Sequence, residues 1–183
     1  MNRIIFLISF LILLYSTTVY SLISTGTIDV YYSPKGGCTN AIIKEIDLAK
    51  KEILIQSYSF SSKPIGQAVV NAYKRGVNIQ LVIDGDQEIA NGNLISYFYS
   101  SGVSVMEDKK HVIAHNKIII IDQTTLITGS FNFSGAAETS NAENMLIIKN
   151  NPELIKSYIN NFNLHKSHSI LYVPVVKTSG VTK

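Results

Sequence analysis

His115 and Lys117 lie two residues apart, at the start of a β-rich segment (HNKIIIID). On one strand, residues at this spacing point to the same face, about 6.6 Å apart. A nucleophilic or acid–base imidazole would then stand beside a fixed positive charge. This pairing suits a phosphodiester, whose anionic oxygens need neutralising while a nucleophile attacks phosphorus. We therefore expect phosphodiester chemistry at this point of the chain.

Further polar residues follow where strands are predicted to end or begin. Gly129 and Ser130 stand at a predicted strand end, where glycine permits a close backbone approach. The side-chain amide of Asn132 can donate a hydrogen bond to a phosphate oxygen. Glu143 is placed on a neighbouring strand, where its carboxylate would hold one ring nitrogen of His115 and leave the other to attack.

These residues form a pattern with fixed spacing, His115-x-Lys117-x4-Asp122 followed by Gly129-Ser130-x-Asn132. The pattern resembles the HKD motif of the phospholipase D superfamily. The NAEN segment at 141–144 is similar to the one that carries that family's supporting glutamate. The likeness covers roughly residues 28–166 and is greatest for short bacterial members with a single motif. These include a small periplasmic endonuclease and short secreted phospholipase D-like proteins.

The resemblance implies a role for each of these residues. His115 would attack phosphorus and form a phosphohistidine intermediate. Lys117 and Asn132 would bind the non-bridging oxygens, and Ser130 would support them. Glu143 would orient His115.

The resemblance implies neither a metal nor a cofactor. Asp122 completes the motif and is counted with the site residues, although in the family it is mainly structural. The sequence agrees, because no grouping of carboxylates or of His/Asp pairs is typical of a two-metal site.

The reaction also needs an acid that protonates the leaving group. One HKD motif supplies one histidine, so we expect a two-fold homodimer in which two copies of His115 flank one phosphate. The family's single-motif members assemble in this way. The intramolecular alternatives are His111, His165 and His168, of which His111 is nearest in sequence but is expected in a solvated loop.

The strands and helices expected around these residues alternate along the chain, which predicts an α/β fold. We expect a mixed sheet with helices on both faces, as the resemblance to a phospholipase D-like half-unit implies. We expect strands at 27–32, 53–60, 77–84, 103–106, 116–122, 125–128 and 143–149. We expect helices at 42–49, 65–75, 89–100 and 152–165. Residues 22–183 would form one domain, with a loosely structured tail from about 169.

Residues 1–21 have the layout of a secretory signal peptide. Arg3 gives a positive start, residues 4–14 are apolar, and VYS at 19–21 offers a cleavage site. The alternative is an uncleaved membrane anchor, since residues 4–23 carry no charge and are just long enough to span a bilayer. We therefore expect export, to the periplasm or outside a bacterial cell.

Composition excludes some classes and leaves the substrate open. With 46% hydrophobic and 16% charged residues, the chain is not a disordered tail, and its single cysteine excludes a disulfide scaffold. The net charge of +3 gives no strong nucleic-acid signal. We expect a phospholipase D that releases the head group of phosphatidylcholine-like lipids at a membrane surface. The alternatives are a non-specific endonuclease on DNA or RNA and a non-catalytic surface or binding protein.

Overall fold

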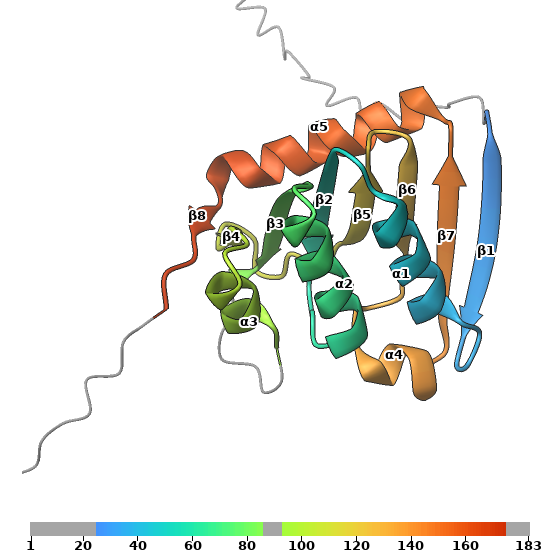
Figure 1. The fold of residues 1–183 in the computed structure, drawn as a ribbon, viewed down its shortest axis with the longest axis horizontal. Helices are drawn as coiled ribbons and strands as arrows, with labels where there is room; N and C mark the ends of the chain where they lie inside the picture. Colours follow the sequence, from blue (N-terminus) through green and yellow to red (C-terminus); the bar gives the residue numbers. More distant parts are fainter. Residues whose placement is uncertain (1–24, 86–92, 175–183) are drawn as a thin grey trace, which may run out of the picture.

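An eight-stranded mixed sheet runs through the protein in a computed structural model that describes residues 25–85 and 93–174. The strands are β1 (Thr27–Ser33), β2 (Glu52–Ser57), β3 (Asn78–Asp84), β4 (Val105–Asp108), β5 (Lys117–Ile121), β6 (Thr125–Gly129), β7 (Glu143–Lys149) and β8 (Ile170–Leu171). They lie in the order β1-β7-β6-β5-β2-β3-β4-β8 (Figure 1). Strands β2, β3 and β4 pair in parallel and the other neighbours pair antiparallel. The predicted mixed α/β sheet is therefore confirmed.

Helices cover both faces of this sheet, as expected. The helices are α1 (Cys38–Leu48), α2 (Lys63–Lys74), α3 (Ile95–Ser100), α4 (Gly135–Thr139) and α5 (Pro152–His168). Helices α1, α2 and α3 share one face, and α5 lies across the opposite face (Figure 1). None of the helices in the described part of the chain is long and apolar enough to cross a membrane.

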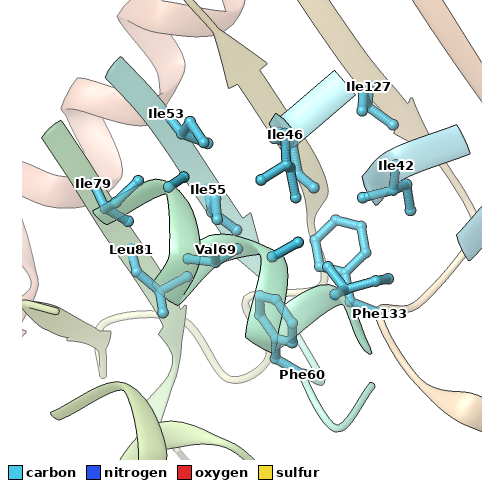
Figure 2. Close-up of a cluster of buried hydrophobic side chains, with 14 of the residues drawn as sticks. Ile42, Ile46, Ile53, Ile55, Phe60, Val69, Ile79, Leu81, Ile127 and Phe133 are labelled. Carbon is cyan, nitrogen blue, oxygen red and sulfur yellow. The ribbon is translucent and has the colours of Figure 1, made fainter. Parts of the chain in front are cut away.

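The run of four isoleucines in β5 is apolar throughout because both sides of the sheet are covered. Ile119 and Ile121 belong to the larger core beneath α1 and α2, while Ile118 and Ile120 belong to the core beneath α5. This alternation is the period of two expected of a strand. Figure 2 shows the larger core between the two helices and the central strands. Two separate cores thus hold β5 at a fixed place in the sheet.

Several predicted boundaries differ from the structure. The tail from about 169 was expected to be loose, but Ile170 and Leu171 pair with β4 and Tyr172 is buried. Helix α5 extends to His168 rather than 165, and β8 begins two residues later. Of the helix expected at 89–100, Ile95–Ser100 is observed, and 86–92 lie outside the described residues. The predicted signal peptide at 1–21 also lies outside them.

Candidate active site

All the predicted site residues except Asp122 gather at one edge of the sheet, formed by the ends of four strands. Antiparallel pairing of β2 with β5 sets Ser57 opposite Lys117. The β5–β6 hairpin continues this edge, because Ile118 pairs with Thr128. Pairing of Gly129 with Met145 then brings the end of β6 beside the start of β7. The sheet topology therefore joins segments that are distant in sequence.

His115 differs from its predicted place on a strand. Strand β5 begins at Lys117, so His115 lies in the segment just before it, with an exposed side chain. Its ring packs against that of Tyr58, with centroids 4.7 Å apart and planes tilted by 55°. The backbone N–H of Tyr58 donates to the carbonyl of Asn116 at 2.9 Å, which fixes this segment against the end of β2. The imidazole is thus supported on one side and open to solvent on the other.

Lys117 is buried and is held close to His115. Its Nζ donates a hydrogen bond to the main-chain carbonyl of His115 at 2.8 Å and lies 5.2 Å from the Tyr58 ring centroid. Burial lowers the pKa of the Lys117 ammonium to about 8, and the negative charge of Glu143 opposes this shift in part. Lys117 is thus close to His115 through the backbone and the shared Tyr58 ring, and not through the strand alternation expected from the sequence.

Glu143 lies at the start of β7, near this edge. Its backbone N–H donates to the hydroxyl of Ser33 at 3.2 Å, and its carboxylate accepts a hydrogen bond from the Asn141 amide at 3.2 Å. Its charge acts on Lys117. Within the described ranges, no hydrogen bond joins Glu143 to the ring of His115. The His115 ring packs against Tyr58 instead.

Gly129, the last residue of β6, allows the chain at Ser130 to come close to Asn144 of β7. Its φ of 148° is in a region that side chains disfavour, and a Cβ there would lie 2.3 Å from the carbonyl oxygen of Asn144. The hydroxyl of Ser130 accepts hydrogen bonds from the Asn144 backbone at 3.0 Å and from its side-chain amide at 3.4 Å. The close approach therefore sets the position of Ser130.

Asn132 is held at the edge by its two neighbours. Phe131 and Phe133 are buried, and the Phe133 carbonyl accepts from the backbone N–H groups of Ser61 and Ser62 at 2.9 and 2.8 Å. The side-chain oxygen of Asn132 is enclosed without a hydrogen-bond partner among the described residues. This oxygen is an acceptor, so it suits a donor group of a ligand, whereas a phosphate oxygen would need the NH2 group of the same amide.

Asp122 lies at the opposite end of β5 and has a structural role. Its carboxylate accepts hydrogen bonds from the backbone N–H groups of Lys50, Lys51 and Glu52 at 2.8, 2.8 and 3.0 Å. Burial opposes ionisation, but these three donors outweigh it and lower the pKa of the carboxyl. Asp122 therefore fastens the turn before β2 to the end of β5 and does not join His115.

The three histidines considered as alternative general acids contact Asp108. His111, His165 and His168 each place a ring nitrogen 2.7–3.2 Å from the Asp108 carboxylate. Across residues 25–85 and 93–174, none of them hydrogen-bonds to His115. This cluster was not predicted. Its local signal is His165-x-x-His168, a spacing that places two side chains on the same face of a helix.

Comparison with known proteins agrees with this fold. The structure matches that of a phospholipase D family member, Nuc from Salmonella typhimurium, with a TM-score of 0.77 and 36% identity, over 81% of this chain and 99% of that one. The structure of NucT from Helicobacter pylori has the same fold, with a TM-score of 0.72 and 22% identity, over 80% and 99% of the two chains. The molecule therefore has the phospholipase D-like fold.

Sequence comparison gives the family. The family model described as cardiolipin synthase, PLD-like domain, matches residues 42–166. Phospholipase D of Rickettsia conorii is 38% identical over 140 residues, which are 76% of this chain and 70% of that protein. Mitochondrial cardiolipin hydrolase of Homo sapiens is 31% identical over 121 residues, 66% of this chain and 48% of that protein. The chain belongs to the phospholipase D superfamily and is a phosphodiesterase.

Proposed function

We propose that the protein is an exported, metal-independent phospholipase D, which releases the head group of phosphatidylcholine-like lipids through a phosphohistidine intermediate. The observation that carries this proposal is the arrangement of His115 and Lys117. The buried Lys117 is hydrogen-bonded to the main chain of the exposed His115, and both side chains contact Tyr58. Asn132 lies at the same edge of the sheet and can donate from its amide NH2 group. Relatives described as phospholipase D support the choice of substrate class.

In the first step, a ring nitrogen of His115 attacks phosphorus. A P–N bond forms, and the bond from phosphorus to the head-group oxygen breaks. The leaving oxygen takes a proton from His115 of the partner subunit, which acts as the general acid. Lys117 and Asn132 bind the non-bridging oxygens and stabilise the negative charge that develops on them.

In the second step, water attacks phosphorus and the P–N bond breaks. His115 of the partner subunit accepts a proton from this water and returns to its starting state. Phosphatidic acid leaves, and the attacking imidazole is regenerated. Two copies of one histidine thus serve as nucleophile and acid–base group, which is the reason for proposing a homodimer with a shared site. The direction of the other three histidines toward Asp108 supports this choice.

The segment before His115 favours a membrane surface as the substrate. Val112 is 92% exposed and Ile113 is 56% exposed, and both follow the cations Lys109 and Lys110. Apolar side chains beside cations are typical of segments that dip into the headgroup region of a bilayer. Export through the signal-like residues 1–21 is part of the same proposal, because it would bring the enzyme to lipid surfaces outside the cytoplasm.

The test gives the purified protein two substrates in parallel, phosphatidylcholine vesicles and plasmid DNA, both in the presence of a chelator. We expect choline release that is lost in His115→Asn, with unchanged circular dichroism. Nicked plasmid without choline release would make the protein a nuclease, and activity should then fall steeply with salt. Activity that survives His115→Asn would contradict the assignment of the nucleophile. A requirement for added Mg²⁺ or Ca²⁺ would contradict the mechanism.

A matched pair of variants tests the membrane contact. Val112→Asp should slow hydrolysis of vesicles while leaving hydrolysis of a short-chain, water-soluble phosphatidylcholine unchanged. Tyr73→Asp, at another exposed apolar position on α2, should affect neither substrate. Equal losses on vesicles and on soluble lipid would show that Val112 does not act through the membrane.

A further inference from the structure

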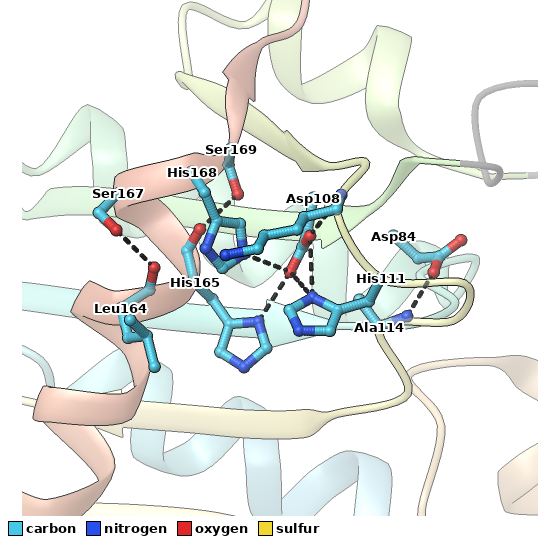
Figure 3. A network of polar contacts seen from close by, with 10 residues as sticks. Asp84, Asp108, His111, Ala114, Leu164, His165, Ser167, His168 and Ser169 are labelled. Atoms are coloured by element: carbon cyan, nitrogen blue, oxygen red, sulfur yellow. Dashed lines mark hydrogen bonds and ion pairs between the residues drawn. The ribbon is translucent and has the colours of Figure 1, made fainter.

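Three histidines and one aspartate converge at the end of β4, outside the site described above (Figure 3). Asp108 ends β4, His111 follows in the segment before β5, and His165 and His168 lie in the last turn of α5. The His111 and His165 Nδ1 atoms lie 2.9 and 2.7 Å from Oδ2 of Asp108, and Nε2 of His168 lies 3.2 Å from the same oxygen. Three elements thus direct four polar side chains at one point.

The distances fit a metal centre. One donor atom from each of the four residues lies within 4.8 Å of every other donor. Four ligands at about 2.0–2.1 Å from a tetrahedral ion lie about 3.3–3.4 Å apart, so the donors would draw closer together around a bound ion. Asp108 is fully buried, and the His165 and His168 side chains are 13% and 17% exposed. His111 is 42% exposed and leaves one open side through which an ion can enter.

Hydrogen bonding alone describes the cluster less well. His165 and His168 both direct a ring nitrogen at Oδ2, and His111 Nδ1 lies 2.9 and 3.1 Å from the two carboxylate oxygens. The three imidazole rings pack around this carboxylate with centroids 4.8–5.5 Å apart. A cation among them accepts a lone pair from each ring instead. The second nitrogen of each ring is then left to carry the proton.

We propose that Asp108, His111, His165 and His168 form a structural site for a divalent transition metal, with Zn²⁺ as the best fit. Imidazole nitrogen with one carboxylate oxygen is a donor set that suits Zn²⁺. Mg²⁺ and Ca²⁺ prefer all-oxygen ligands, so these ions are excluded. Four protein ligands leave no position for a substrate, which makes the site structural rather than catalytic.

The metal would join three parts of the molecule that are distant in sequence. It would tie the end of α5, and hence β8, to β4 and to the segment 109–116 that leads to His115. That segment is fastened beyond His111 as well, because the backbone N–H of Ala114 donates to Asp84 at 2.6 Å. The ion therefore stabilises the fold near the candidate active site without contacting the reacting groups.

The test uses the full-length chain, freed of metal by a chelator and then exchanged into chelator-free buffer. We expect it to take up one equivalent of Zn²⁺, measured by mass spectrometry of the metal, and to unfold at a higher temperature with Zn²⁺ than without. Co²⁺ should give the intense visible absorption of a tetrahedral complex. Mg²⁺ should do neither. Absence of stoichiometric uptake would overturn the proposal.

Variants identify the ligands. His165→Asn and His111→Asn should each weaken Zn²⁺ binding by at least roughly 10–100-fold, the loss typical for disturbed metal sites. His111 lies in an exposed segment, so this variant keeps a folded protein in which binding can be measured. His115→Asn removes a histidine outside the cluster and should bind one equivalent as before. Loss of binding in His115→Asn, or unchanged binding in both ligand variants, would contradict the assignment.

Discussion

Lys117 donates a hydrogen bond from Nζ to the main-chain carbonyl of His115, with a nitrogen–oxygen distance of 2.8 Å. The lysine is thereby folded back toward the residue that precedes its strand, and its ammonium lies over Tyr58, whose ring also packs against His115. The imidazole and the cation are held in one fixed relationship by the backbone and by a shared aromatic ring. Given the proposed role of Lys117 in binding the phosphate, we expect its charge state to control activity.

Activity should therefore fall as pH rises through about 8. The pKa of Lys117 is lowered by burial to about 8, so its cation is present below that pH and is lost above it. Because the cation stabilises charge on the phosphate, kcat/KM should show a basic limb near that pH. Lys117→Ala should reduce kcat/KM by roughly 10²–10³-fold.

The variant Lys117→Arg tests whether the ionisation of Lys117 causes this basic limb. A guanidinium does not lose its proton in a protein, so Lys117→Arg should retain part of the activity and move the basic limb to higher pH. The measurement is kcat/KM against pH for both proteins. A basic limb that stays near 8 in the arginine variant would mean that another group controls it.

Gly129→Ala should damage both stability and activity. The new Cβ would lie 2.3 Å from the carbonyl of Asn144, and the φ of 148° is unfavourable for alanine. We expect a loss of about 1–3 kcal/mol in the free energy of unfolding, together with lower kcat because Ser130 and Asn132 are displaced. Gly135→Ala is the matched control, since a Cβ there meets no atom within 4 Å. Equal effects of the two variants would contradict the role of the close approach.

Asp122→Asn should lower stability without changing the chemistry. Asparagine tolerates the left-handed backbone at this position, where φ is 50°, but it lacks the charge that the three N–H donors favour. We expect a loss of about 1–3 kcal/mol at neutral pH, with kcat per folded molecule unchanged.

The pH dependence of that loss follows from the lowered pKa of Asp122. The stabilisation is present above the pKa of an unfolded carboxyl and is lost as pH falls through the folded pKa. The difference between wild type and Asp122→Asn should therefore shrink under acid conditions. Asp47→Asn, at an exposed carboxylate, is the control and should have little effect. A difference that does not change with pH would contradict this account.

The sequence predicts the fold well because hydrophobic periodicity and strand order determine it. Continuous apolar runs in β2 and β5 are typical of strands buried on both faces, and each of these strands contributes to both cores. The candidate active-site residues could be found from their motif spacing. Their contacts could not, because alternation fixes the direction of a side chain only within a strand. His115 illustrates this, since it precedes β5 rather than lying on it.

Contacts between distant segments were harder to predict. Asp108 and His165 are 57 residues apart in sequence, and they meet because β8 returns the chain from α5 to β4. The two-residue β8 follows a helix and has no alternation of its own, so the pattern of the tail did not indicate it. When β8 is not predicted, His165 and His168 are expected only at the end of a helix, and nothing indicates what they contact. The cluster thus depends on tertiary structure that short-range spacing does not encode.

Mixed dimers test whether two copies of His115 share one site. When wild-type protein and His115→Asn are combined in equal amounts and allowed to exchange subunits, about a quarter of the dimers contain two wild-type chains. If both histidines are needed, activity per wild-type chain should fall by about half after exchange, because mixed dimers are inactive. Independent sites would leave it unchanged. Lys44→Ala, at an exposed position on α1, is the control partner and should cause no loss. Unchanged activity with His115→Asn, in dimers shown by mass spectrometry to be mixed, would assign the general acid to another residue.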